Sequence, residues 1–218
     1  MDVRARTAIF LSRCLLNSEL REFGFAPRHL KRYMLRAKYM LSLDNTLWKE
    51  LKHRGWNGVE SFDSDAPFIP EELKLLLKNP RDFDRFDYIS PYLSSENTTW
   101  EAAYAAMPYI VEITRKLSPK ERTTHLITIG FIVWDSDPKI EENAKIKPFL
   151  PAYKQALREA MPLLLETILE EQSATDTRYL LATIAALKGY SELGELIQAL
   201  HYYTECPNCN AEIFELNE

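Results

Sequence analysis

An internal match at a spacing of 54 residues constrains the fold of this chain more than any other feature. The segment Ala106-Met107-Pro108-Tyr109-Ile110-Val111-Glu112 aligns with Ala160-Met161-Pro162-Leu163-Leu164-Leu165-Glu166, and the same offset continues into the apolar stretches that follow. Each copy has the pattern of a helix with an interior proline, a short turn and a second apolar helix. The match predicts two helix pairs, at 100–134 and 151–189, with the two prolines at equivalent kinks.

Composition also favours helices. The chain has only six glycines in 218 residues and is rich in Leu, Ala, Glu and Lys, which disfavours a turn-rich β fold. Stacked helix pairs are typical of HEAT and armadillo repeats, whose period is about 40–47 residues. A linker at 136–150 accounts for the longer period here. We therefore predict an all-α fold, an α-α superhelix of HEAT- or armadillo-like helix pairs, with room for a small C-terminal hairpin.

Charge divides the chain into three regions. Residues 1–43 carry nine Lys/Arg against three acidic residues, a net charge of +6, and read as a basic helical segment. Residues 44–203 form the expected HEAT-like domain. Residues 204–218 are an acidic Cys-x-x-Cys tail, and from Glu192 onward there are six Glu and no Lys or Arg. The basic start can bind an acidic partner, including the chain's own remainder, and in that case its deletion should lower thermal stability.

Two short motifs predict where helices begin. The segments 98–101 (Thr-Thr-Trp-Glu) and 118–121 (Ser-Pro-Lys-Glu) match the capping box, in which a hydroxyl and a carboxylate satisfy backbone amides at a helix start. A helix is expected to follow each of them directly.

The stretch 93–112 resembles the signature of a family of bacterial HEAT-repeat proteins of unassigned function. Their pattern is roughly His-Gln-Gly-Thr-Val-Tyr-Glu-Ala-Thr-Ala followed by Val-Pro-Phe-Leu, and several members end in a Cys-Pro-x-Cys-Gly knuckle. The resemblance covers about residues 45–216. Here His-Gln-Gly is replaced by Ser-Glu-Asn at 95–97, and the knuckle glycine is replaced by Asn210. A function tied to that histidine is therefore not carried over.

Cys206 and Cys209 have the spacing of half a zinc knuckle. Tetrahedral zinc needs four ligands, and His201 is the one further candidate close by. We interpret the pair as a vestigial half-site and predict that the monomer holds no stoichiometric zinc and needs no cofactor. Two chains together would supply four thiolates.

The remaining reactive residue types form no catalytic pattern. The four histidines are scattered, and His125 reads as a hydrogen-bonded core residue within an apolar helix. Cys14 lies on an apolar helical face and is interpreted as a core residue. A phosphate loop, a zinc-protease motif and a nucleophile elbow are all missing from the sequence. Trp56, in an expected loop, is the candidate partner contact, because Trp is enriched in interface hot spots.

Two classes of function remain open. The first is a non-catalytic protein-binding scaffold or adaptor in the cytoplasm that uses the surface of the helix pairs. The alternative is a HEAT-like enzyme or nucleic-acid module resembling the alkylpurine DNA glycosylases, which would need a basic concave face. The net charge of −5 favours a protein partner over nucleic acid. No stretch approaches the ~20 apolar residues of a membrane span, so we expect no membrane partner.

Overall fold

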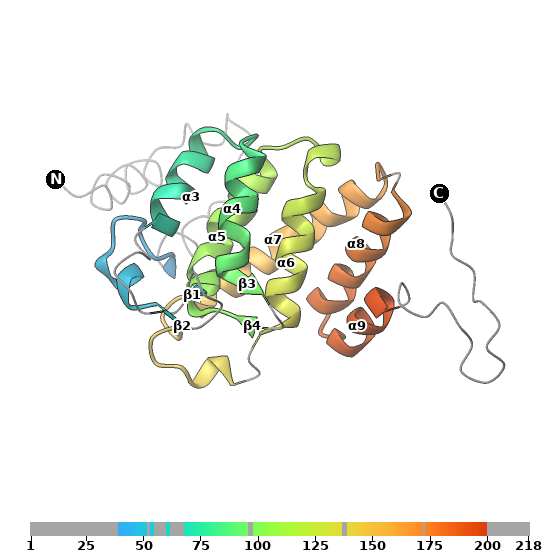
Figure 1. Cartoon of the computed structure of the whole chain (residues 1–218). Coiled ribbons are helices and arrows are strands. Elements are labelled where there is room, and N and C mark those ends of the chain that lie inside the picture. The colour runs from blue at the N-terminus through green and yellow to red at the C-terminus, as the bar shows by residue number, and fades with distance from the viewer. Residues whose placement is uncertain are drawn as a thin grey trace, which may run out of the picture. The chain divides into compact units, whose positions relative to one another are not determined.

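The computed structural model of the chain describes residues 39–51, 53–54, 60–61, 68–95, 98–136, 139–171 and 173–199. In this part of the chain, seven α-helices pack in antiparallel pairs (Figure 1). The predicted all-α class is confirmed, whereas the superhelix and the repeat remain predictions. The basic segment up to residue 38, the Cys-x-x-Cys tail and the C-terminal hairpin lie outside the described residues.

The described α-helices are α3 (Phe68–Lys78), α4 (Phe83–Leu93), α5 (Glu101–Arg115), α6 (Thr123–Trp134), α7 (Leu150–Ile168), α8 (Ala174–Leu187) and α9 (Ser191–Ala199). Single 3-10 turns are η2 (Thr46–Glu50), η3 (Pro119–Glu121) and η4 (Ile140–Glu142). Two antiparallel pairs of two-residue strands are β1 (His53–Arg54) with β2 (Glu60–Ser61), and β3 (Ser94–Ser95) with β4 (Thr98–Thr99). None of the helices in these ranges is long and apolar enough to cross a membrane.

The local signals for helix ends are correct in several places. The Glu121 carboxylate accepts a 2.9 Å hydrogen bond from the Ser118 backbone N–H, although the segment opens the 3-10 turn η3 before α6 begins. Helix α6 ends at Trp134, directly before Asp135. Helix α8 ends before Gly189, whose φ of +85° lies in the left-handed region that glycine tolerates best.

The capping box predicted at 98–101 is wrong. Thr98 and Thr99 form β4, and helix α5 starts after Trp100 without a side-chain cap. The Thr99 hydroxyl instead donates to the Ile132 carbonyl at 2.8 Å, and its backbone N–H bonds the Asp135 carbonyl. Contacts with the end of α6 therefore replace the local cap.

Helix α5 lies at the centre of the packing. It packs on α3 and on α7, while α6 packs most extensively on α8, and α8 also carries α9. In Figure 1, α7 passes behind α6. Four alanines in the first half of α5 are buried, and their small side chains let the neighbouring helices approach closely.

The two matching segments differ in burial along their outer sides. Their inward positions are alike, because Ala106 and Ala160 are both fully buried. Val111 is also fully buried, but Leu165, its counterpart in α7, is 50% exposed. Both interior prolines sit within continuous helices, Pro108 buried and Pro162 exposed. The outer positions of the pattern are thus buried in α5 and exposed in α7.

Two glycines mark close approaches of helices. A Cβ on Gly130 would lie 2.2 Å from the Thr183 hydroxyl, so α6 and α8 touch at this point without room for a methyl group. A Cβ on Gly194 would lie 2.2 Å from the Trp134 indole nitrogen. The backbone of α9 therefore lies directly against the last residue of α6.

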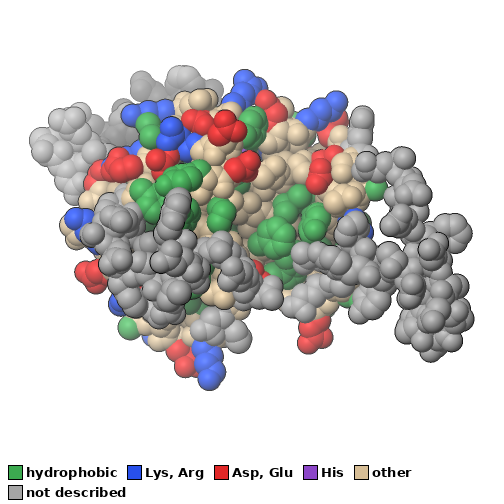
Figure 2. All heavy atoms as spheres, in the orientation of Figure 1, with side chains coloured by type: hydrophobic (Ala, Val, Ile, Leu, Met, Phe, Trp, Pro, Cys, Tyr) green, Lys and Arg blue, Asp and Glu red, His purple; other side chains and the backbone are tan. Residues whose placement is uncertain are grey.

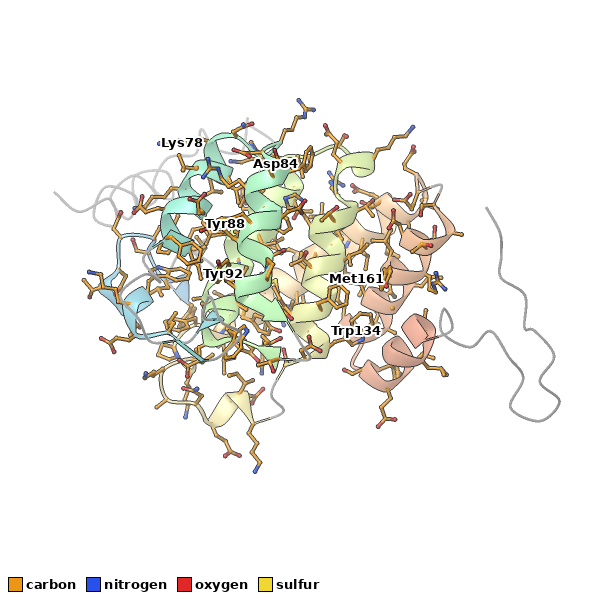
Figure 3. The ribbon with its side chains drawn as sticks, viewed as in Figure 1. Lys78, Asp84, Tyr88, Tyr92, Trp134 and Met161 are labelled. Carbon is orange, nitrogen blue, oxygen red and sulfur yellow. The ribbon has the colours of Figure 1, made fainter. Side chains whose placement is uncertain are left out.

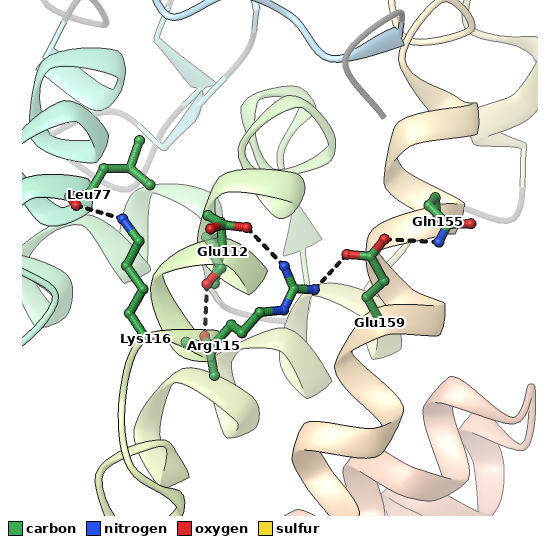
Figure 4. A network of polar contacts seen from close by, with 8 residues as sticks. Leu77, Glu112, Arg115, Lys116, Gln155 and Glu159 are labelled. Carbon is green, nitrogen blue, oxygen red and sulfur yellow. Dashed lines mark hydrogen bonds and ion pairs between the residues drawn. The ribbon is translucent and has the colours of Figure 1, made fainter. Parts of the chain in front are cut away.

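Ion pairs and a hydrogen bond connect neighbouring helices at the C-terminal end of α5 (Figure 4). Arg115 donates to Glu112 in its own helix at 2.9 Å and to Glu159 of α7 at 2.6 Å. Lys116 donates to the Leu77 carbonyl at the end of α3. Arg115 and Lys116 thus connect the C-terminal end of α5 to both α7 and α3.

Candidate functional site

Three aromatic rings contact one another on the outside of the α3–α4 pair. The centroid of Phe68 lies 4.8 Å from that of Tyr92 and 5.8 Å from that of Tyr88, and the two tyrosines are 5.8 Å apart. Tyr88 is 50% exposed, and the other two rings are half-buried. Figure 2 shows apolar side chains gathered over this helix pair. Such a cluster combines apolar surface with polar hydroxyl groups, as many interface hot spots do.

Helix periodicity places the two tyrosines away from the buried face of α4. Phe86, Ile89 and Leu93 form the fully buried face of α4. Tyr88 and Tyr92 are one turn apart, so they share a face on the side toward α3. Figure 3 shows their side chains between α3 and α4.

Arg85 links α4 to α3 beside the aromatic cluster. Its guanidinium donates to Asp82 at 2.9 Å and also pairs with Glu72 of α3. The hydrogen bond from Arg85 keeps the pKa of Asp82 below its usual value. Arg85 therefore connects α3 and α4 beside the aromatic cluster.

Negative charge borders the cluster. Asp84 and Asp87 are exposed on α4 and form no ion pair with any other described residue. Asp84 lies one turn before Tyr88, so carboxylates and rings follow each other along the helix. A partner with a cation beside an apolar group would match this surface.

A second aromatic group lies along the α6–α8 seam. Phe131 contacts Trp134 at 5.5 Å and Tyr179 of α8 at 6.0 Å between centroids. Trp134 is buried, whereas Phe131 and Tyr179 are half-buried, and Figure 2 shows apolar side chains over α6 and α8 as well. We call the side formed by α3, α4, α6 and α8 the aromatic face.

His125 is buried behind the aromatic face rather than displayed on it. Its ring stacks on Phe86 with centroids 3.6 Å apart, and Phe83 meets it edge-on. Neither ring nitrogen has a hydrogen-bond partner among the described residues, which corrects the expectation of a hydrogen-bonded core histidine. Desolvation lowers its pKa to about 4, so the ring is neutral at physiological pH.

The site residues proposed from sequence all lie outside the described residues. They are Cys206 and Cys209 of the half knuckle, and Trp56 of the expected contact loop. Among the residues that are described, no three His, Cys, Asp or Glu side chains gather as a metal would require. The zinc and contact hypotheses therefore remain predictions.

Sequence reasoning missed the aromatic cluster. The spacing of Tyr88 and Tyr92 by one helical turn, opposite the apolar face of α4, was a usable signal for an exposed tyrosine pair. Phe68 has no such signal, because it joins the cluster only through the packing of α3 on α4.

Comparisons of the chain with models of known protein families, with characterised proteins and with solved structures find no match.

Proposed function

We propose that this protein is a non-catalytic scaffold that binds a segment of another protein along the aromatic face. The observation that carries the proposal is the exposed cluster of Phe68, Tyr88 and Tyr92 next to the carboxylates of Asp84 and Asp87. Large aromatic side chains have few rotatable bonds and lose little conformational entropy on binding, so they make effective anchors. The partner segment is expected to carry apolar side chains with Lys or Arg close by.

The stacking of the helix pairs supports the same proposal. First helices pack on first helices (α3, α5, α7), and α6 packs on α8. This is how repeats of the HEAT class build an extended binding surface. The two aromatic groups on α3–α4 and α6–α8 suit an extended segment rather than a small molecule.

The nucleic-acid alternative has less support. It requires free cations on one face, yet Arg81, Arg85, Arg115 and Arg122 each donate to carboxylates within the described part. Phosphate binding would have to compete with these ion pairs. Gel-shift measurements at low salt would detect any oligonucleotide affinity.

Selection of random peptides on the purified protein tests the scaffold proposal. We expect enriched peptides to combine an aromatic or aliphatic residue with Lys or Arg. The double variant Tyr88→Ala/Tyr92→Ala should weaken their binding by more than about tenfold, measured by fluorescence anisotropy. Tyr190→Ala, an exposed tyrosine beside α9, is the matched control and should change binding less than about twofold.

The contribution of Asp84 and Asp87 to binding can be tested with the same peptides. Asp84→Asn/Asp87→Asn should weaken binding and flatten its dependence on salt, since rim charges act mainly through long-range attraction. Peptides that bind the tyrosine double variant as tightly as the wild type would overturn the proposal.

A further inference from the structure

The outward side of α7 is an apolar surface that no described element covers. Leu165 is 50% exposed and Leu169 is 84% exposed, one turn apart on the same side as Pro162. Leu181 of α8 is also exposed. Isolated exposed leucines are ordinary, but successive turns of one helix that present Pro and Leu form a stripe.

The matching side of α5 shows how such a stripe is covered inside this protein. Tyr104 of α5 contacts Tyr153 of α7 with centroids 5.1 Å apart, and Arg115 reaches Glu159 of α7. Val111 is fully buried there. A helix therefore covers the outer side of α5, and the outer side of α7 has the same pattern with no described helix on it.

Charges along α7 indicate which helix fits. The exposed charged side chains before Pro162 are basic, Lys154 and Arg158, and those after it are acidic, Glu166 in α7 and Glu170 just beyond its end. The spacing is symmetric, because Arg158 and Glu166 each lie four residues from Pro162, and Lys154 and Glu170 each lie eight residues from it. A helix with this order is complementary to itself when the second copy runs antiparallel.

We infer that a second copy of this chain docks on the outer side of α7, with a twofold axis near Pro162. In this arrangement Arg158 faces Glu166 of the partner subunit, and Lys154 faces Glu170 of the partner subunit. Leu165 from each copy packs beside the central prolines. A parallel arrangement would place like charges opposite each other, so the charge order selects the isologous dimer.

The charged side chains are available for these contacts. Arg158 and Glu170 form no ion pair with another described residue. Lys154 pairs with Glu141 at an exposed site. Glu166 is bound by Arg122 within the chain at 2.7 Å, yet its side chain is 57% exposed and can accept a second donor.

The dimer should be weak. Helix α7 has 19 residues and is about 28 Å long, so a helix-to-helix contact falls short of the roughly 800 Å² per partner of a standard interface. We expect dissociation constants in the micromolar range or above. Sedimentation equilibrium of the full chain across a wide concentration range should show a monomer–dimer equilibrium.

Substitution of the apolar centre is the first test. Leu165→Glu should weaken the dimer by more than about tenfold, because it buries a charge at the axis. Leu193→Glu, which alters a comparably exposed leucine on α9, is the control and should leave dimerisation unchanged. Circular dichroism of each variant checks that it folds.

Charge exchange tests the twofold geometry. Lys154→Glu alone and Glu170→Lys alone each place like charges opposite one another, so both should dimerise about tenfold more weakly than the wild type. An equimolar mixture of the two variants should form heterodimers, because every pair is then opposite in sign. The doubly substituted chain should dimerise with itself again.

Several outcomes would overturn the inference. They are a chain that stays monomeric at millimolar concentration, a dimer indifferent to Leu165→Glu, and charge variants that fail to recover on mixing. A monomeric chain would leave the stripe to another occupant, such as a different protein.

Discussion

Helix α5 and helix α7 carry the same seven-residue pattern in different surroundings. In α5 the segment 106–112 is covered by α3 on one side and α7 on the other, and its apolar positions are all buried. In α7 the segment 160–166 keeps only its inward positions buried. The comparison teaches that the pattern itself encodes two apolar faces. Whether the second face becomes core depends on the presence of a neighbour.

The largest effect is expected from placing a charge at the outer position of each pattern. Val111→Asp should destabilise the protein by more than about 4 kcal/mol, because the carboxylate would be buried without a partner. Leu165→Asp should cost no more than about 0.5 kcal/mol when measured on the monomer at low concentration. Urea unfolding of the two variants gives both values. Equal losses would show that the outer side of α7 is covered after all.

A smaller effect is expected from the buried imidazole of α6. Burial lowers the pKa of His125 from 6.5 to about 4, so the unfolded chain takes up a proton before the folded one as the pH falls. Stability that is present above pH 6.5 is therefore lost between pH 6.5 and 4. Between pH 7 and pH 5 the wild type should lose about 2 kcal/mol more than His125→Leu.

The matched control for that measurement lies 54 positions further on. Tyr179 lies in α8 at the same sequence offset that relates the two matching segments, and it is half-buried. Tyr179→Leu should keep the wild-type dependence on pH, because it leaves the imidazole in place. Urea unfolding at both pH values decides the matter, and a His125→Leu variant with the wild-type slope would contradict the assignment.

The smallest effect distinguishes the two prolines. Pro162→Ala should raise stability by about 1 kcal/mol, since the exposed ring leaves few contacts behind and the helix regains a backbone donor. Pro108→Ala should give no such gain, because removal of the buried ring opens a gap between packed helices. Thermal melts of the two variants measure the difference, and a gain in both would mean that the Pro108 ring contributes little to packing.

The helix pairs at 100–134 and 151–189 were predictable because apolar periodicity and the breakers at their ends act locally. The strand pair that replaces the cap before α5 was not, since Thr99 is held by Ile132 and Asp135, more than thirty residues away. The aromatic cluster was half predictable for the same reason. The one-turn spacing in α4 predicts its pair of tyrosines, whereas Phe68 belongs to α3 and joins the cluster only through the packing of the two helices.

The burial of the tryptophans gives the protein its own optical probes. Trp48, Trp100 and Trp134 are all buried, so their native emission should lie at short wavelength. Trp134 differs from the other two because the backbone of α9 at Gly194 lies directly on its indole. In a Trp56→Phe variant, if α9 detaches first on heating, a collisional quencher such as acrylamide will reach this indole while Trp48 and Trp100 are still protected. Steady-state fluorescence can thus follow α9 separately from the helices around Trp48 and Trp100.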